Sequence, residues 1–162
     1  MIKQELRIAY TDFENENELN AEDRGLLQKA RETCDQAYAP YSNFHVGAAL
    51  LLENGIIVCG NNQENAAFPS GLCAERVAVF AAGANYPGVK IKTIAITCKS
   101  ESFPVNEPLS PCGACRQSMS EYEIRYKSNI RILLQGETGK IRMMNSIADL
   151  LPFMFVAEDL KK

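Results

Sequence analysis

The spacing of apolar and polar positions changes several times along the chain, and each change predicts a different element. Over residues 2–13 the apolar side chains fall on alternate positions, a period typical of a strand. From Asn20, which suits a helix N-cap, apolar residues recur at helical spacing until Pro40. We therefore expect a strand followed by a helix that ends before Pro40.

A β-hairpin is expected next. Residues 46–52 and 56–59 are two apolar runs, and Asn54-Gly55 between them is the strongest short hairpin signal that a sequence offers. Residues 73–84 then have helical character, with small alanines at the packing positions. Two antiparallel strands and a second helix should therefore follow the first helix.

The remaining elements complete a layered α/β domain. They are expected at 91–97 (a buried strand), 112–122 (a helix), and 130–135 and 140–144 (strands around a glycine-containing turn). Ser146 is suited to cap a last short helix that stops before Pro152. This order predicts a single three-layer domain in which helices flank a mixed sheet of about five strands.

Composition and charge restrict the class of protein. The chain has 162 residues, of which 46% are apolar and 23% charged, as in an ordinary globular domain. Its net charge of −3 and the absence of Lys/Arg runs argue against a surface for DNA, RNA or anionic lipid. No apolar stretch reaches the length of a membrane span, and the N-terminus lacks a signal-peptide core. We expect a cytoplasmic protein with a small uncharged ligand.

In the cytoplasm thiols stay reduced, so the six cysteines require an explanation other than disulfides. Only Cys112 and Cys115 have the two-residue separation with which a pair binds one metal ion. Cys34, Cys59 and Cys98 fall within expected core elements. A free thiol there packs like a small apolar side chain. Cys73 therefore remains as a third candidate ligand.

Two segments carry the candidate chemistry, Cys73-Ala74-Glu75-Arg76 and Pro111-Cys112-Gly113-Ala114-Cys115-Arg116. Each opens an expected helix, whose positive N-terminal end stabilises thiolates in its first turn. Three protein ligands with a fourth position open to water are typical of catalytic zinc, whereas structural zinc normally has four. The segments therefore predict catalytic Zn²⁺ on Cys73, Cys112 and Cys115.

Glu75 follows Cys73 by two positions and is the candidate proton carrier. Its carboxylate could accept the proton that zinc makes acidic and return it to substrate and leaving group. Three thiolates weaken zinc as a Lewis acid, and Arg76 is the candidate cation that offsets their charge. The lone His45 lies far from both motifs in sequence, and we expect it to be a structural or rim residue. The cysteine pair alone fits structural zinc about equally well, but Cys73 and Glu75 together favour catalysis.

These segments resemble the signatures of the cytidine deaminases, and zinc deaminases in general combine Pro-Cys-x-x-Cys with a non-ligand glutamate. Residues 40–48 are similar to the family's loop and first strand at the site, and residues 62–67 to its ribose-contacting segment. The resemblance covers about residues 22–156, with the motifs in order. A cysteine at position 73, rather than histidine, resembles the short homotetrameric branch.

The resemblance implies hydrolysis of cytidine and deoxycytidine to uridine and deoxyuridine, with release of ammonia, as in pyrimidine salvage. Zinc-activated water would attack C4 of the base, while Glu75 moves protons to N3 and the departing amine. In that branch the arginine matching Arg76 hydrogen-bonds the ligand thiolates. The implied substrate contacts are Phe44 in the base pocket, Asn62 and Glu64 on the ribose, Ala74, and Phe155 reaching a neighbouring subunit's site.

Some of these residues also have simpler interpretations. Judged without the family pattern, Asn62 and Glu64 fit an Asx turn and a solvated charge. By the same standard Phe155 is a core or plain interface residue, and Phe44 is the start of a buried strand.

The chain also departs from the family pattern. We divide it into an N-terminal extension, residues 1–21, packed on the domain, a catalytic domain of residues 22–156, and a tail of residues 157–162. Compact members lack such an extension. Phe68 stands where many relatives carry Tyr, and the stretch 99–110 is longer than in compact members. The longer stretch could reshape the pocket mouth, so the substrate range is less defined than the reaction.

Three other functions remain open. The nearest is a deaminase for a modified cytosine nucleoside or a nucleoside antibiotic. A deaminase acting on polynucleotide is disfavoured by the acidic charge and the absence of aromatic-basic patches. In a non-catalytic zinc-stabilised binding module, Cys112 and Cys115 would support the fold and Glu75 would be incidental.

Overall fold

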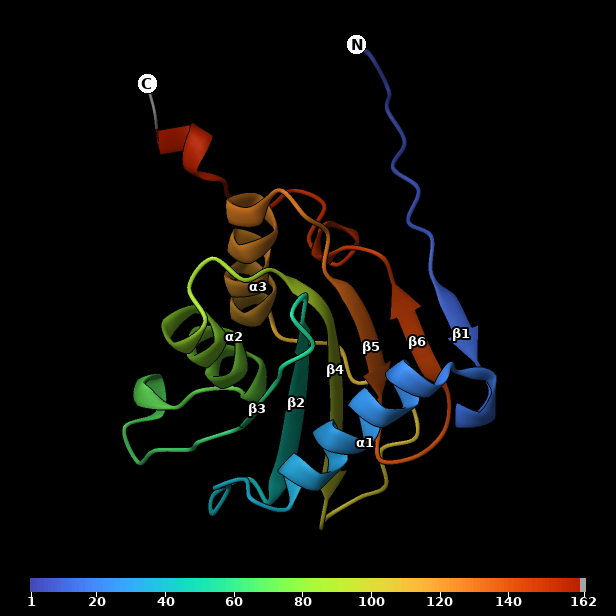
Figure 1. The fold of residues 1–162 in the computed structure, drawn as a ribbon, viewed down its shortest axis with the longest axis vertical. Helices are drawn as coiled ribbons and strands as arrows, with labels where there is room; N and C mark the ends of the chain where they lie inside the picture. The colour runs from blue at the N-terminus through green and yellow to red at the C-terminus, as the bar shows by residue number, and fades with distance from the viewer. Residues whose placement is uncertain (161–162) are drawn as a thin grey trace.

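The computed structural model describes residues 1–160, in which six strands form one mixed sheet between two layers of helix (Figure 1). The strands are β1 (Thr11–Phe13), β2 (Phe44–Leu52), β3 (Ile57–Asn61), β4 (Ile91–Ser100), β5 (Arg131–Gln135) and β6 (Ile141–Met144). Their order is β1-β6-β5-β4-β2-β3, and only β4 and β5 pair in parallel. The expected mixed, three-layer α/β domain is confirmed, with one strand more than the estimate.

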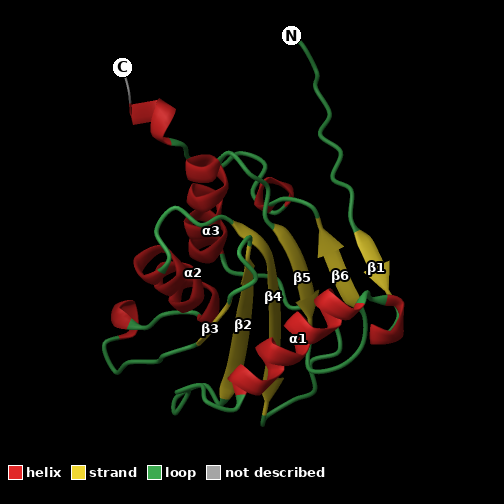
Figure 2. Ribbon diagram, in the orientation of Figure 1, coloured by secondary structure: helices red, strands yellow, loops and turns green. Residues whose placement is uncertain are grey.

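Helix α1 (Ala21–Cys34) covers one face of the sheet, and α2 (Ala74–Asn85) and α3 (Gly113–Tyr126) cover the other (Figures 1 and 2). The 3₁₀ turns are η1 (Glu16–Glu18), η2 (Phe68–Ser70), η3 (Ile147–Asp149) and η4 (Ala157–Leu160). Within residues 1–160, no helix combines the length and the apolar character needed to cross a membrane.

Alternation along the strands separates the two cores. In β2 and from Ile94 to Ile96 in β4, core side chains at odd positions pack under α1 and those at even positions pack under α2 and α3. Ile91, beyond the register shift at Leu51/Leu52, also packs under α2 and α3. The α1 core includes Leu26, Leu27, Ala49, Leu51 and Ala95. The other core includes Ala48, Leu50, Ala78, Ile94 and Met119. Because β2 and β4 are buried on both faces, they form nearly continuous apolar runs.

Two glycines let the helices approach the sheet closely. A Cβ on Gly60 of β3 would lie 2.5 Å from the Ala78 nitrogen and 2.6 Å from the Ala74 oxygen. A Cβ on Gly47 of β2 would likewise collide with the backbone of α1 at Ala30. The absence of a side chain at Gly60 therefore sets the position of the first turn of α2.

The N-terminal pattern forms less strand than its period suggests. Of residues 2–13, only β1 pairs with the sheet, through Asp12 opposite Arg142 in β6. Residues 1–10 form no helix or strand and lead away from the sheet (Figure 1). Partner β6 is only four residues long, so the apolar positions before β1 find no ladder. At the other end, residues 161–162 of the expected tail lie outside the described residues.

Candidate active site

The three candidate ligands lie at the starts of two helices. Cys73 and Cys112 are the N-cap residues of α2 and α3, and Cys115 lies in the first turn of α3. The Sγ atom of Cys112 is 3.8 Å from that of Cys73 and 3.4 Å from that of Cys115. All three sulfur atoms lie within 4.8 Å of one another, and all three cysteines are free of disulfides. The fold therefore assembles both motifs into one cluster.

The geometry and chemistry of this cluster fit zinc. Tetrahedral coordination with Zn–S bonds of about 2.3 Å places sulfur atoms roughly 3.8 Å apart. The separations of 3.4 and 3.8 Å are close to this value. Thiolates are soft ligands, which select zinc over calcium or magnesium. Among the described residues the cluster has three donors, so a fourth coordination position is open, as catalytic zinc requires.

The cluster already favours one thiolate. Contact with the Cys115 thiol and with Arg76 lowers the pKa of Cys73 to about 5. The pKa of Cys115 is raised, because its thiol contacts Cys73 and is buried. Arg76 places Nη2 4.0 Å from the Cys73 sulfur, and its buried Nε has no hydrogen-bond partner in the described part of the chain. The guanidinium thus supplies positive charge beside the ligand sulfurs.

Glu75 occupies the first turn of α2, directly after Cys73 and Ala74. Its side chain is almost completely buried, with 4% of the residue exposed. Burial disfavours the charged carboxylate and raises the pKa of Glu75, and the negative charge of Cys73 acts in the same direction. A carboxyl group that holds its proton more strongly than usual suits a group that must both accept and donate protons.

A cleft of about 470 Å³ reaches the cysteine cluster at Cys73. Of the expected site residues, Asn62, Glu64, Cys73 and Arg76 line it. Phe68 also lines the cleft and is exposed. The cleft therefore joins the candidate metal site to the candidate ribose contacts.

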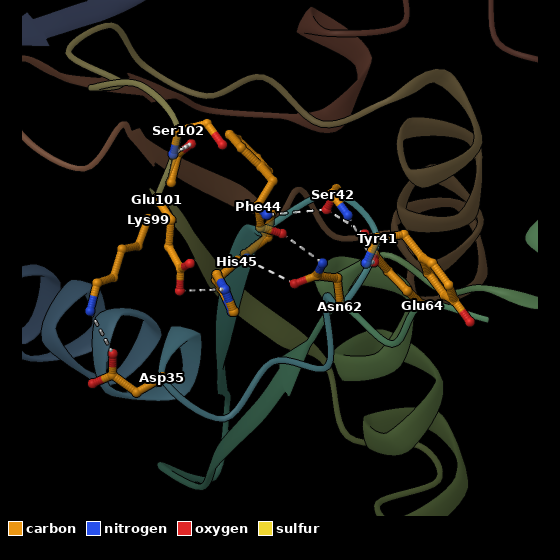
Figure 3. Close-up of polar contacts among 12 residues, drawn as sticks. Asp35, Tyr41, Ser42, Phe44, His45, Asn62, Glu64, Lys99, Glu101 and Ser102 are labelled. Carbon is orange, nitrogen blue, oxygen red and sulfur yellow. Dashed lines mark hydrogen bonds and ion pairs between the residues drawn. The ribbon is translucent and has the colours of Figure 1, made fainter. Parts of the chain in front are cut away.

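Asn62 binds the first residues of β2, and Glu64 binds the loop that leads into this strand (Figure 3). The Asn62 side chain accepts a hydrogen bond from the Val46 nitrogen at 2.7 Å and donates one to the Phe44 oxygen at 2.9 Å. Glu64 accepts from the Tyr41 nitrogen at 2.9 Å, from the Ser42 nitrogen at 3.3 Å and from the Ser42 hydroxyl. Asn62 thus forms no Asx turn, and Glu64 is not merely a solvated charge.

These contacts keep Glu64 ionised. Burial is slight and acts to raise the pKa of Glu64, but the hydrogen bonds from Ser42 and Tyr41 outweigh it and lower the pKa. The side chain remains at the cleft wall as a charged acceptor.

The other expected residues occupy different environments. Ala74 is completely buried at the first position of α2. Phe155 is 57% exposed, and the Gln117 side chain holds its backbone, donating to the Phe155 oxygen at 2.8 Å and accepting from its nitrogen at 3.3 Å. His45 faces Glu101 (Figure 3), with Nε2 3.7 Å from the carboxylate. It is not a member of the cysteine cluster.

Sequence reasoning gave no role to Ser42, Gln117 or Phe103. Ser42 lies in the segment 40–48 and Gln117 directly follows the second cysteine motif. Their partners, the Glu64 carboxylate and the Phe155 backbone oxygen, are distant in sequence. Phe103 stacks on Phe44, with ring centroids 6.2 Å apart and planes at 28°. No local pattern signals this pair, because the contact depends on how β2 and β4 are paired.

Comparison with known proteins gives a consistent result. The family model described as the cytidine and deoxycytidylate deaminase zinc-binding region matches residues 20–128. The chain is 40% identical over 136 residues to the cytidine deaminase of Sporosarcina psychrophila, covering 83% of this chain and 92% of the relative. It is 37% identical over 135 residues to that of Halalkalibacterium halodurans, covering 83% and 95%.

Solved structures share the fold. The cytidine deaminase from Burkholderia pseudomallei is 38% identical to this chain and superposes with a TM-score of 0.71. The match covers 85% of this chain and 100% of the Burkholderia chain. The cytidine deaminase from Mycobacterium tuberculosis has 31% identity and a TM-score of 0.66, covering 85% and 99%. Both matches leave a similar fraction of this chain uncovered.

Proposed function

The chain belongs to the cytidine deaminase family and catalyses zinc-dependent hydrolysis of cytidine and deoxycytidine to uridine and deoxyuridine, and we propose which residues do so. Cys73, Cys112 and Cys115 hold the zinc ion, and Glu75 moves the protons. The observation that carries this proposal is the cluster of three sulfurs with an open fourth position, in contact with a buried carboxyl group.

The residues of the chain divide the reaction between them. Bound zinc lowers the pKa of a water molecule, so that water can act as a nucleophile near neutral pH. Glu75 takes a proton from the attacking water and delivers it to N3 of the base. It then takes the second proton from the new C4 hydroxyl and delivers it to the amino group, which leaves as ammonia while C4 becomes a carbonyl. Arg76 offsets the charge of the thiolates. The N-termini of α2 and α3 add further positive charge at the same place.

Substrate contacts follow from the cleft. Glu64 is a charged acceptor on its wall, and its hydrogen bonds to the Tyr41–Ser42 loop hold it ready for a ribose hydroxyl. Asn62 lines the same cleft. The family resemblance, rather than the lining of the cleft, assigns Phe44 and Ala74 to the base. Glu64→Gln should raise the KM for cytidine and change kcat little, since a contact to unreacting ribose contributes uniform binding. An unchanged KM would remove Glu64 from the ribose site.

Replacement of Glu75 tests the central assignment. Glu75→Gln keeps the shape of the side chain but cannot carry the proton, and Glu75→Ala removes the group. We expect both variants to retain about one zinc ion per chain and to lose roughly 10²- to 10⁴-fold in kcat. Zinc is measured by elemental analysis, and conversion of cytidine to uridine by ultraviolet absorbance.

Chelator-treated wild-type protein is the matched control, because it lacks the metal but retains Glu75. It should lose activity and recover it when zinc is restored. If both Glu75 variants kept wild-type kcat with zinc bound, Glu75 would not be the proton carrier. If they lost zinc as well, Glu75 would be supporting the metal site.

The oligomeric state and the cellular location are also part of the proposal. We infer a cytoplasmic homotetramer in which Phe155 reaches a neighbouring subunit's site. In support, Phe155 and Phe68 are exposed, and Gln117 fixes the backbone that carries Phe155. We also retain the division into an extension of residues 1–21, a catalytic domain of residues 22–156 and a tail.

A further inference from the structure

The loop that joins β4 to α3 is tied to the start of β2. The Glu101 nitrogen donates a hydrogen bond to the Asn43 oxygen at 3.3 Å. The Glu101 carboxylate also lies 3.7 Å from Nε2 of His45, as Figure 3 shows. The first residues of this loop therefore keep a defined place beside the strand that begins at Phe44.

The same loop is held again a few residues later. The Val105 oxygen accepts hydrogen bonds from the Glu137 nitrogen at 2.7 Å and from the Thr138 nitrogen at 3.3 Å. A Cβ on Gly136 would lie 2.7 Å from the Glu107 oxygen and closer still to Val105, so the loop packs directly on the turn between β5 and β6. Phe103 lies between the two attachments, which limits how far its backbone can move.

Phe44, the aromatic partner of Phe103, has a fixed backbone. Its nitrogen donates to the Ser42 hydroxyl at 3.1 Å, and its oxygen accepts from the Asn62 amide at 2.9 Å (Figure 3). With both backbone groups held, rotation about the side-chain bonds is the main freedom left to this residue. Phe103 restricts that freedom, because its ring lies at 28° to the Phe44 ring with centroids 6.2 Å apart.

We propose that Phe103 is a positioning residue that fixes the orientation of the Phe44 ring at the base pocket. This inference rests on the proposed contact between Phe44 and the base, and deepens it. Phe103 is 58% exposed, so its ring does little for the core, whereas the stacked pair holds one face of Phe44. The orientation of Phe44 in the free enzyme then affects how well cytidine binds.

Steady-state kinetics of full-length, zinc-loaded variants test this role. We expect Phe103→Ala to raise the KM for cytidine roughly two- to tenfold, the range that an aromatic pair supports. Its kcat and Tm should stay near the wild-type values. Phe103→Tyr keeps a ring and should retain the wild-type KM, whereas Phe103→Leu should behave like Phe103→Ala. In a Phe44→Ala background, Phe103→Ala should have no further effect.

Tyr10→Ala is the matched control, since Tyr10 is 55% exposed and contacts Arg142 near the β1 edge of the sheet. It should not change KM. A wild-type KM in Phe103→Ala, when Phe44→Ala raises KM, overturns this inference alone. An equal further rise in the double variant also overturns it. An unchanged KM in Phe44→Ala overturns the base-pocket role of Phe44 and this inference with it, while leaving the Glu75 assignment intact.

Discussion

Gly60 controls how closely α2 approaches the sheet and therefore where Glu75 stands. A Cβ there would meet the backbone of α2 at Ala74 and Ala78, which cannot move as a side chain can. We expect Gly60→Ala to lower the free energy of unfolding by about 1–3 kcal/mol, as overpacking does. It should also reduce kcat, because it displaces the helix turn that carries Glu75. Urea denaturation and steady-state kinetics measure the two effects.

Gly25 provides the opposite control. It lies in α1, and nothing stands within 4 Å of the position that a Cβ would take. Gly25→Ala should raise the free energy of unfolding by about 0.5–1 kcal/mol, because alanine favours the helix. Equal effects of the two substitutions would show that the close approach at Gly60 does not position α2.

Among individual residues, the metal ligands were the easiest to predict from the sequence. Cys73 and Cys112 could be placed because their motifs open helices, and a helix N-terminus is where a thiolate is favourable. The hydrogen bonds of Asn62 could not be predicted, because they depend on strand pairing between positions 16 and 18 residues apart. A local sequence pattern indicates secondary-structure propensity and helix caps. It does not indicate hydrogen-bond partners that only the tertiary fold brings together.

Glu123 connects α3 to the residue before β5 and to the start of η3. This buried side chain accepts hydrogen bonds from the Ile130 nitrogen at 2.6 Å, just before β5, and from the Ile147 nitrogen at 2.9 Å in η3. The Ser146 hydroxyl donates to its other oxygen at 2.9 Å. The carboxylate thus joins the end of α3 to both segments that pack beside it.

Glu123→Ala should therefore destabilise the protein without acting on the chemistry. It leaves two buried N–H groups without partners, and we expect the free energy of unfolding to fall by about 2–4 kcal/mol. Glu121→Ala, at an exposed position of the same helix, should change it by less than about 0.5 kcal/mol. Urea denaturation distinguishes the two. A small loss in Glu123→Ala would mean that water replaces the carboxylate.

The order and type of the longer elements could be predicted from the sequence. Their apolar positions repeat with the period of a helix or strand, and these same positions pack into the two cores. The helix expected from Asn20 begins there, with the Asn20 side chain accepting from the Asp23 nitrogen at 2.8 Å. The strand expected over residues 2–13 shrank to β1, because alternation indicates which positions suit a sheet but not whether a partner strand is long enough.

At the scale of the whole molecule, the shared-site proposal predicts complementation. Phe155→Ala should lower kcat/KM, because it removes an aromatic ring from a neighbour's site, and Glu75→Ala should be inactive. Mixed tetramers reformed from the two variants should regain activity, since a Phe155→Ala chain keeps Glu75 and receives Phe155 from its neighbour. Light scattering should give the mass of four chains. A monomer, or mixtures no more active than their parts, would contradict the shared site.

The outward course of residues 1–10 also bears on how the enzyme can be handled. Their exit lies at the β1 edge of the sheet, whereas the cleft adjoins β3 at the opposite edge. The chain after Phe155, by contrast, leaves from a backbone that Gln117 ties to α3, the helix that carries two of the sulfur ligands. A tether, dye or solid support is therefore better attached to the first residue than beyond Phe155.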